Sequence, residues 1–224
     1  MIAPGCLALI VLLFLFLVPF LYAEIMFTAM AKLGLSSSAA LMIVFGVLFG
    51  SFVNIPIKRI PRREACAVDI FQIYGISRLF PQVRRWNQST LIAVNLGGCV
   101  IPCLVALFQL IRIAQYGGTI LAAAIIISVL NVAVCYFIAR PVAGVGIMMP
   151  ALVPPIVAAG GALLLAPNYA PPVAFVAGVA GPVIGADLLH LKDIHRISTG
   201  VASIGGAGTF DGIVLSGVVA AFLA

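Results

Sequence analysis

The sequence predicts an all-α integral membrane protein, a polytopic bundle of about seven transmembrane helices with broken or re-entrant segments. Three observations support this fold class. Hydrophobic residues make up 64% of the chain and charged residues only 8%, whereas soluble domains carry roughly 25% charged residues. Apolar runs recur at about the 20-residue length that crosses a bilayer. Basic residues gather in a few connecting segments. We therefore expect one integral-membrane domain over residues 1–224.

The expected spans follow the apolar runs in chain order. The first run carries no charge. Leu21-Tyr22-Ala23 resembles a signal-peptidase site, but no Lys or Arg precedes it, so we prefer a retained span to a cleaved signal peptide. Ser36 to Ser38 could cap the second span. The predicted spans are residues 3–23, 38–56, 90–113, 119–139, 146–166, 172–190 and 200–223.

The fifth span contains three prolines, Pro150, Pro154 and Pro155, within an apolar stretch. Broken helix at membrane depth is tolerated only where protein or a water-filled cavity covers the freed backbone groups. We therefore expect this span to be kinked, with a re-entrant start.

Basic residues give the expected orientation. Residues 57–89 form one long, basic, polar loop, and all Lys and Arg except Lys32 and Arg112 fall on its side of the predicted bundle. The positive-inside rule makes that loop and the N-terminus cytoplasmic and the C-terminus external, in what we expect to be a prokaryotic plasma membrane. The lipid bilayer is the expected partner, with anionic headgroups near the loop. Nucleic acid is not expected, because no basic domain with interleaved aromatic residues is present.

The five cysteines form no CxxC pair, which favours packed thiols over a zinc ribbon or a disulfide scaffold. Cys99 and Cys103 are four residues apart and would share a helix face. Two ligands without a third nearby make a poor metal site. We therefore expect no metal and no cofactor.

The stretch from Gly181 to Gly212 holds both histidines and three of the six acidic residues. Two of the acids, Asp187 and Asp211, lie in apolar surroundings. A carboxylate at the centre of a membrane helix costs roughly 2.5–3.5 kcal/mol, so it is rarely left there without a use. His190, three residues after Asp187, could add a third ligand, although a solvated residue near the interface is the simpler interpretation.

The glycines before Asp211 predict how the two carboxylates meet. Each glycine in the segment GGAG weakens a helix by about 1 kcal/mol relative to alanine. An unwound segment would let the chain fold back and bring Asp211 level with Asp187. We therefore predict that these two residues face one another across a membrane-embedded hairpin.

Three segments resemble known membrane proteases. The pattern GSFxNxxIxRxP is similar to the N-terminal signature of type IV prepilin peptidases, and the four-cysteine zinc motif of many members does not carry over, because only Cys66 follows. Asp187 with GAGTFD resembles the paired motifs of GxGD-type membrane aspartyl proteases, and Pro150-Ala151-Leu152 spells the PAL tripeptide of presenilin-like proteases. The C-terminal half also resembles a prokaryotic multi-pass family of unassigned function. The residues that match the first pattern are Gly50, Ser51, Phe52, Asn54, Ile57, Arg59 and Pro61.

These resemblances imply a diaspartyl protease that acts near the cytoplasmic face on a peptide or membrane-protein substrate. One aspartate would activate water while its protonated partner polarises the scissile carbonyl. Two alternatives stay open: a small-solute or ion carrier with both aspartates as proton or cation ligands, and a non-catalytic membrane scaffold. The sequence does not identify the substrate or the oligomeric state. The predicted catalytic residues are Asp187 and Asp211, and the predicted substrate-binding residues are Gly206, Gly208, Pro150, Ala151 and Leu152.

Overall fold

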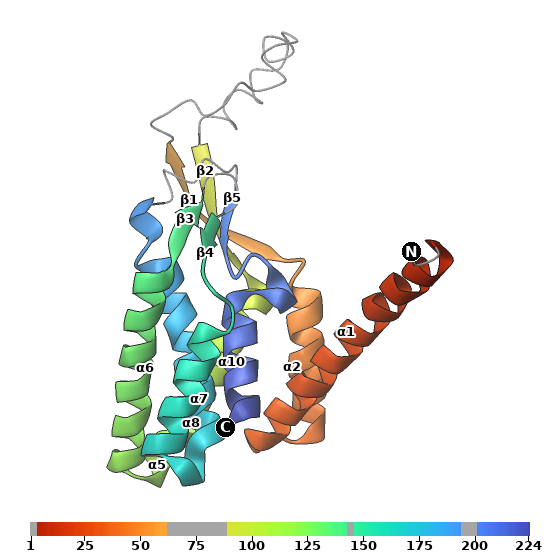
Figure 1. The fold of residues 1–224 in the computed structure, drawn as a ribbon. Helices are drawn as coiled ribbons and strands as arrows, with labels where there is room; N and C mark the ends of the chain where they lie inside the picture. The colour runs from red at the N-terminus through yellow and green to blue at the C-terminus, as the bar shows by residue number, and fades with distance from the viewer. Residues whose placement is uncertain (1–3, 62–88, 143–145, 194–200) are drawn as a thin grey trace.

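The computed structural model describes residues 4–61, 89–142, 146–193 and 201–224. These residues form a helical bundle with small β-sheets at one end (Figure 1). Two π-helical turns, η2 and η4, continue directly into or from a longer helix. The α-helices are α1 (Pro4–Lys32), α2 (Ser37–Gly50), α5 (Ile101–Tyr116), α6 (Gly118–Ile138), α7 (Val153–Leu165), α8 (Ala170–Ala180) and α10 (Gly212–Leu223). The remaining helical turns are η2 (Leu96–Val100), η3 (Pro167–Tyr169), η4 (Gly181–Leu188), η5 (Leu191–Asp193) and η6 (Gly208–Phe210).

Three helical stretches of the described chain are long and apolar enough to cross a membrane: Leu96–Tyr116, Gly118–Ile138 and Pro167–Asp193. They coincide with the predicted third, fourth and sixth spans and identify a membrane protein. The apolar helices α2, α7 and α10 have only 14, 13 and 12 residues. At 1.5 Å per residue they reach about 20 Å, short of a hydrocarbon core of about 30 Å. The prediction of seven spans is therefore not confirmed.

Helix α1 is longer than the predicted first span. It continues without interruption through Tyr22 and Glu24 to Lys32, where a short connection was expected from residue 24. Its N-terminal end projects away from the bundle (Figure 1). Its C-terminal half is packed, because Met26 and Met30 are almost fully buried.

The prediction of an all-α fold is wrong at one end of the bundle, where two small sheets form. β1 (Asn54–Pro61), β2 (Ser89–Asn95) and β5 (Val201–Ile204) make a three-stranded sheet in the order β1-β2-β5. β2 pairs antiparallel with β1 and parallel with β5. A second sheet pairs β3 (Arg140–Val142) with β4 (Gly146–Met148). Strands thus replace parts of the predicted second, third, fifth and seventh spans.

Local sequence explains why these segments are extended. Pro56 and Pro61 cannot donate a backbone hydrogen bond inside a helix, and β1 tolerates them because it lies at a sheet edge. β1 and β2 are rich in isoleucine, valine and threonine, which favour strands. Ile92 of β2 is buried and packs against Ile60, Ile147 and Ala202 from three other strands. β2 is apolar over residues 91–94, so hydropathy alone does not separate this strand from a helix.

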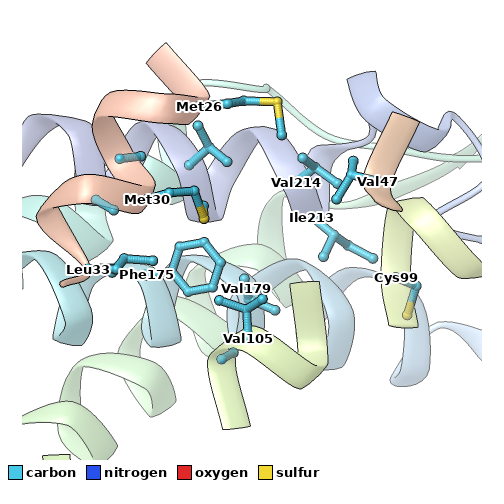
Figure 2. Close-up of a cluster of buried hydrophobic side chains, with 14 of the residues drawn as sticks. Met26, Met30, Leu33, Val47, Cys99, Val105, Phe175, Val179, Ile213 and Val214 are labelled. Atoms are coloured by element: carbon cyan, nitrogen blue, oxygen red, sulfur yellow. The ribbon is translucent and has the colours of Figure 1, made fainter. Parts of the chain in front are cut away.

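The core lies between α1, α2, α5, α8 and α10. Figure 2 shows Met26 and Met30 of α1 beside Phe175 of α8 and Val214 of α10. Helix α8 is the central element, and almost all of its residues are buried. A Cβ at Gly178 would lie 2.7 Å from the Ser216 carbonyl oxygen of α10. Small residues therefore permit the close helix contacts that membrane bundles require.

Two cations lie at the end of the bundle opposite the sheets. Lys32 Nζ donates to the Phe222 carbonyl at 2.6 Å, and Arg112 Nη1 donates to the Leu33 carbonyl at 2.9 Å. Both satisfy carbonyls at helix C-termini, where positive charge is favourable. Most of the predicted basic loop, residues 62–88, lies outside the described residues, as does Cys66.

Candidate functional site

The site is built on the tight turn from Gly205 to Ala207, which joins β5 to η6 and α10. Gly205 has φ +71°, a conformation that glycine adopts at no steric cost. The Gly206 N–H donates to the Ser203 carbonyl and the Gly208 N–H to the Gly205 carbonyl, so the chain reverses within a few residues. The segment GGAG is therefore not α-helical, and Asp211 follows its last glycine by three residues.

This turn lies beside both carboxylates. The Gly205 backbone is close enough to the carboxylate of Asp187, in η4, to interact with it. The Ala207 N–H donates to Asp211 Oδ2 at 3.2 Å, and Asp211 Oδ1 accepts from Ile213 N–H at 3.0 Å as the N-cap of α10. The two carboxylates interact electrostatically, and both residues are half-buried. The structure thus brings Asp187 and Asp211 together around one turn.

Asp187 is held in a π-helical turn, a form that is frequent at functional sites. A Cβ at Gly185 would lie 2.3 Å from the Val132 carbonyl oxygen, so η4 packs directly on α6. His190 lies two residues after the end of η4. Its Nδ1 is 3.0 Å from the Ala186 carbonyl oxygen, and its ring centroid is 4.9 Å from the ring centroid of Tyr136. His190 is only 8% exposed. The interpretation of His190 as a solvated residue is wrong, because its ring caps buried carbonyls.

Backbone-to-backbone packing fixes the other side of the turn. A Cβ at Gly98 would lie 2.0 Å from the Gly205 carbonyl oxygen, and one at Gly97 would lie 2.1 Å from the Val47 carbonyl oxygen of α2. Two adjacent glycines in η2 therefore let α2 and the aspartate turn approach from different directions. The next residue, Cys99, is buried and interacts electrostatically with both Asp187 and Asp211.

A buried polar network supports this arrangement. Asn95 Oδ1 accepts from the Gly98 N–H at 2.7 Å, and Asn95 Nδ2 donates to the Ser51 carbonyl at 2.8 Å and to Asn54 Oδ1 at 3.1 Å. Asn54 Oδ1 also accepts from Ser203 Oγ at 2.6 Å. Asn54 was expected near the end of the predicted span 38–56. Instead it begins β1, and its side chain is hydrogen-bonded to Asn95 of β2 and Ser203 of β5. A single asparagine is typical of an interhelical bond, so the sequence offered no signal for a network this extensive.

The two predicted substrate-binding glycines differ in environment. Gly208 is buried with φ +62°, and a Cβ there would lie 2.5 Å from Ser51 Cβ. Ser51 Oγ in turn lies 3.0 Å from Thr209 Oγ1. Gly206 is exposed, between the two residues whose backbone lies beside the carboxylates. Gly208 therefore packs the turn onto α2, and only Gly206 presents open backbone.

The predicted PAL residues lie between β4 and α7, and all three are exposed. Met149, just before them, reaches the start of α10, since a Cβ at Gly212 would lie 2.8 Å from Met149 Cε. Met149 and Ile147 also pack against a cluster that contains Ala186, the neighbour of Asp187. The chain leading into Pro150 therefore contacts the elements that carry both aspartates.

Within the described residues, no three His, Cys, Asp or Glu side chains come close enough to hold a metal ion. Cys99 and Cys103 lie in the same hydrophobic cluster. Both are free, as is Cys135.

Comparison with known proteins gives one match. A family model described as a protein of unknown function (DUF1614) matches residues 48–223, which include Asp187, Asp211 and the glycine turn but neither α1 nor most of α2. No curated protein and no solved structure matches the chain.

Proposed function

Because the chain belongs to the DUF1614 family of proteins of unknown function, its activity has to be argued from the site, and we propose a membrane-embedded diaspartyl protease. The observation that carries the proposal is the shared turn. The Gly205 backbone lies beside the Asp187 carboxylate, the Ala207 N–H donates to Asp211 Oδ2, and the two carboxylates interact electrostatically. A structural pair of aspartates needs no such common scaffold.

The proposed chemistry follows from two coupled carboxylates. In this proposal the two carboxylates share one proton. The ionised member would activate water as a general base, and the protonated member would polarise the scissile carbonyl. The N–H groups of Ala207 and Ile213, which donate to Asp211, would keep its carboxylate oriented during the reaction.

The proposed substrate is an extended peptide segment of a membrane protein. Gly206 is exposed within the turn, and glycine allows another backbone to approach closely. The exposed residues Pro150, Ala151 and Leu152 would line the approach, as their resemblance to the PAL tripeptide implies. The resemblance of Asp187 and the segment around Asp211 to the paired motifs of GxGD-type proteases suggests the same reaction class.

The proposed orientation places the sheets and the site near the cytoplasmic face of a prokaryotic plasma membrane. Lys58 and Arg59 lie on β1 and Arg140 on β3, while Lys32 and Arg112 lie at the opposite end. The positive-inside rule then makes the N-terminus cytoplasmic and the C-terminus external.

A carrier is the second candidate, and one observation favours it. Ser216 Oγ is buried in α10 without a hydrogen-bond partner among the described groups, and Asp211 caps the same helix. An unpaired oxygen near a carboxylate and beside broken helices suits a cation or proton pathway.

One experiment separates the two functions. Purified protein in sealed liposomes is offered a membrane-helix peptide and, separately, a pH gradient with candidate solutes. Cleavage that is lost in Asp187→Asn and in Asp211→Asn, but kept in the control Asp193→Asn, supports the protease. The amide keeps the side-chain shape and removes the proton chemistry, so folded protein is expected in all three variants. Gradient-driven uptake that is lost in Asp211→Asn, without cleavage of any offered helix, refutes the protease.

A further inference from the structure

Helix α1 reaches the aspartate site through one side chain, Tyr22. Its hydroxyl donates to the Thr209 carbonyl at 2.9 Å. Its ring stacks on Phe210, with centroids 5.3 Å apart and planes 28° apart. It also interacts electrostatically with Asp211. Tyr22 therefore contacts Thr209 and Phe210, the two residues that precede Asp211.

The position of Tyr22 is set by the packing of α1 along α10. Ten residues after Tyr22, Lys32 Nζ donates to the Phe222 carbonyl at 2.6 Å and lies 5.7 Å from the Phe222 ring centroid. Between these two contacts, Met26 and Met30 are buried in the core that includes Val214 (Figure 2). The C-terminal half of α1 thus holds α10 at both ends, and Tyr22 is its contact at the end that carries Asp211.

Thr209 is held from two sides. Its carbonyl accepts from Tyr22 of α1, and its hydroxyl lies 3.0 Å from Ser51 Oγ, just after α2. Phe210 is 56% exposed even though the Tyr22 ring covers one of its faces. Without Tyr22, the residue that precedes Asp211 would have little else to restrain it.

We infer that Tyr22 is a positioning residue for Asp211, so that α1, which lies outside the family match, completes the site. The hydroxyl fixes the Thr209 carbonyl and the ring fixes Phe210, and together they set where the Asp211 carboxylate points relative to Asp187. Errors of about 1 Å in such a position can cost a hundredfold in rate. The catalytic part of this inference rests on the proposed protease, whereas the restraint on the turn does not.

The test uses Tyr22→Phe, which keeps the ring stack and removes the hydrogen bond, and Phe210→Leu, which removes the stack and keeps the hydroxyl. Tyr116→Phe is the matched control, because the Tyr116 ring pairs with that of Tyr169, 4.7 Å away in another part of the fold. Hydrogen exchange of the full-length protein in detergent reports on the amides of Gly208, Phe210 and Asp211, whose acceptors lie within the turn.

We expect Tyr22→Phe and Phe210→Leu to speed exchange of these amides about five- to tenfold, with no change in α5 or α6 and none in Tyr116→Phe. In cleavage assays we expect kcat to fall by a similar factor while KM stays within twofold, because the substrate-facing Gly206 is untouched. Exchange equal to wild type in both variants refutes the restraint. Faster exchange with unchanged kcat refutes the catalytic role. If the wild type cleaves nothing, the proposed function fails and exchange alone decides whether Tyr22 holds the turn.

Discussion

Replacing Gly98 by alanine tests how the site is assembled. The new Cβ would lie 2.0 Å from the Gly205 carbonyl oxygen and 2.9 Å from its carbonyl carbon. Carbon–oxygen contacts in proteins are rarely closer than about 3.3 Å, so η2 and the aspartate turn must separate by roughly 1 Å. Both neighbours at this contact are backbone, so no side chain can rotate away. We expect overpacking to cost about 1–3 kcal/mol in the free energy of unfolding.

The same displacement acts on catalysis. Gly205 lies beside the Asp187 carboxylate, and Asp211 follows six residues later, so a shift of about 1 Å in the turn moves one carboxylate against the other. We expect kcat to fall about a hundredfold. Gly160→Ala is the control, because nothing lies within 4 Å of its added Cβ in α7. It should leave kcat unchanged and stabilise the helix by up to about 1 kcal/mol. Thermal unfolding in detergent and cleavage kinetics measure both effects, and Gly98→Ala with wild-type stability and kcat would refute the reasoning.

Three further predictions follow from the structure. Asn95→Ala and Asn131→Ala should each lower the free energy of unfolding by about 1–3 kcal/mol, because both side chains are buried and hydrogen-bonded. Only Asn95→Ala should also lower kcat. Equal kcat values in the two variants would contradict the role of the Asn95 network at the site. Cleavage should show a bell-shaped pH profile and inhibition by a hydroxyl-bearing transition-state mimic, whereas a flat profile would remove the carboxylate pair from the reaction. Single cysteines placed at 57–89 should resist an impermeant label in intact cells and those placed after Ala220 should react, and the reverse pattern would invert the orientation.

Parts of the fold could be predicted from the sequence because their signals are local. The run Gly118–Ile138 is apolar, long enough to span and free of charge, so hydropathy located it within a residue. Ser36 caps α2 as expected, with its Oγ accepting from the Ala39 N–H at 3.3 Å. The segment GGAG was expected to unwind because glycine disfavours helix, and Gly205 and Gly208 do adopt positive φ.

The β-structure could not be predicted in the same way. β2 is apolar over residues 91–94, as a transmembrane helix would be, and its pairing with β1 and β5 depends on contacts between distant parts of the chain. The parallel pairing of Ile92 with Ala202 joins residues that no local pattern connects. Pro56 and Pro61 were the available local signals for an extended edge strand, but we placed Pro56 at the end of the second span and Pro61 in the basic loop.

The candidate site was only partly accessible from the sequence. A carboxylate in apolar surroundings is conspicuous, which is why Asp187 and Asp211 were selected. Tyr22 was missed because its partner Thr209 lies 187 residues away and an aromatic residue in an apolar helix carries no distinctive signal. His190 was assigned to the interface because a polar residue near a predicted loop looks solvated, whereas the irregular end of η4 buries it.

The most direct test of the account is whether residues 187 and 211 meet in a lipid bilayer. A variant with cysteine at both positions, and its five native cysteines replaced by alanine, is reconstituted and treated with a short thiol cross-linker. The control pairs residue 187 with Leu164→Cys, a residue 83% exposed near the far end of α7 (Figure 1). We predict rapid cross-linking of 187 to 211 and none of 187 to 164. Failure of the first pair to link, in protein that unfolds like the wild type, would contradict the convergence on which the proposed site rests.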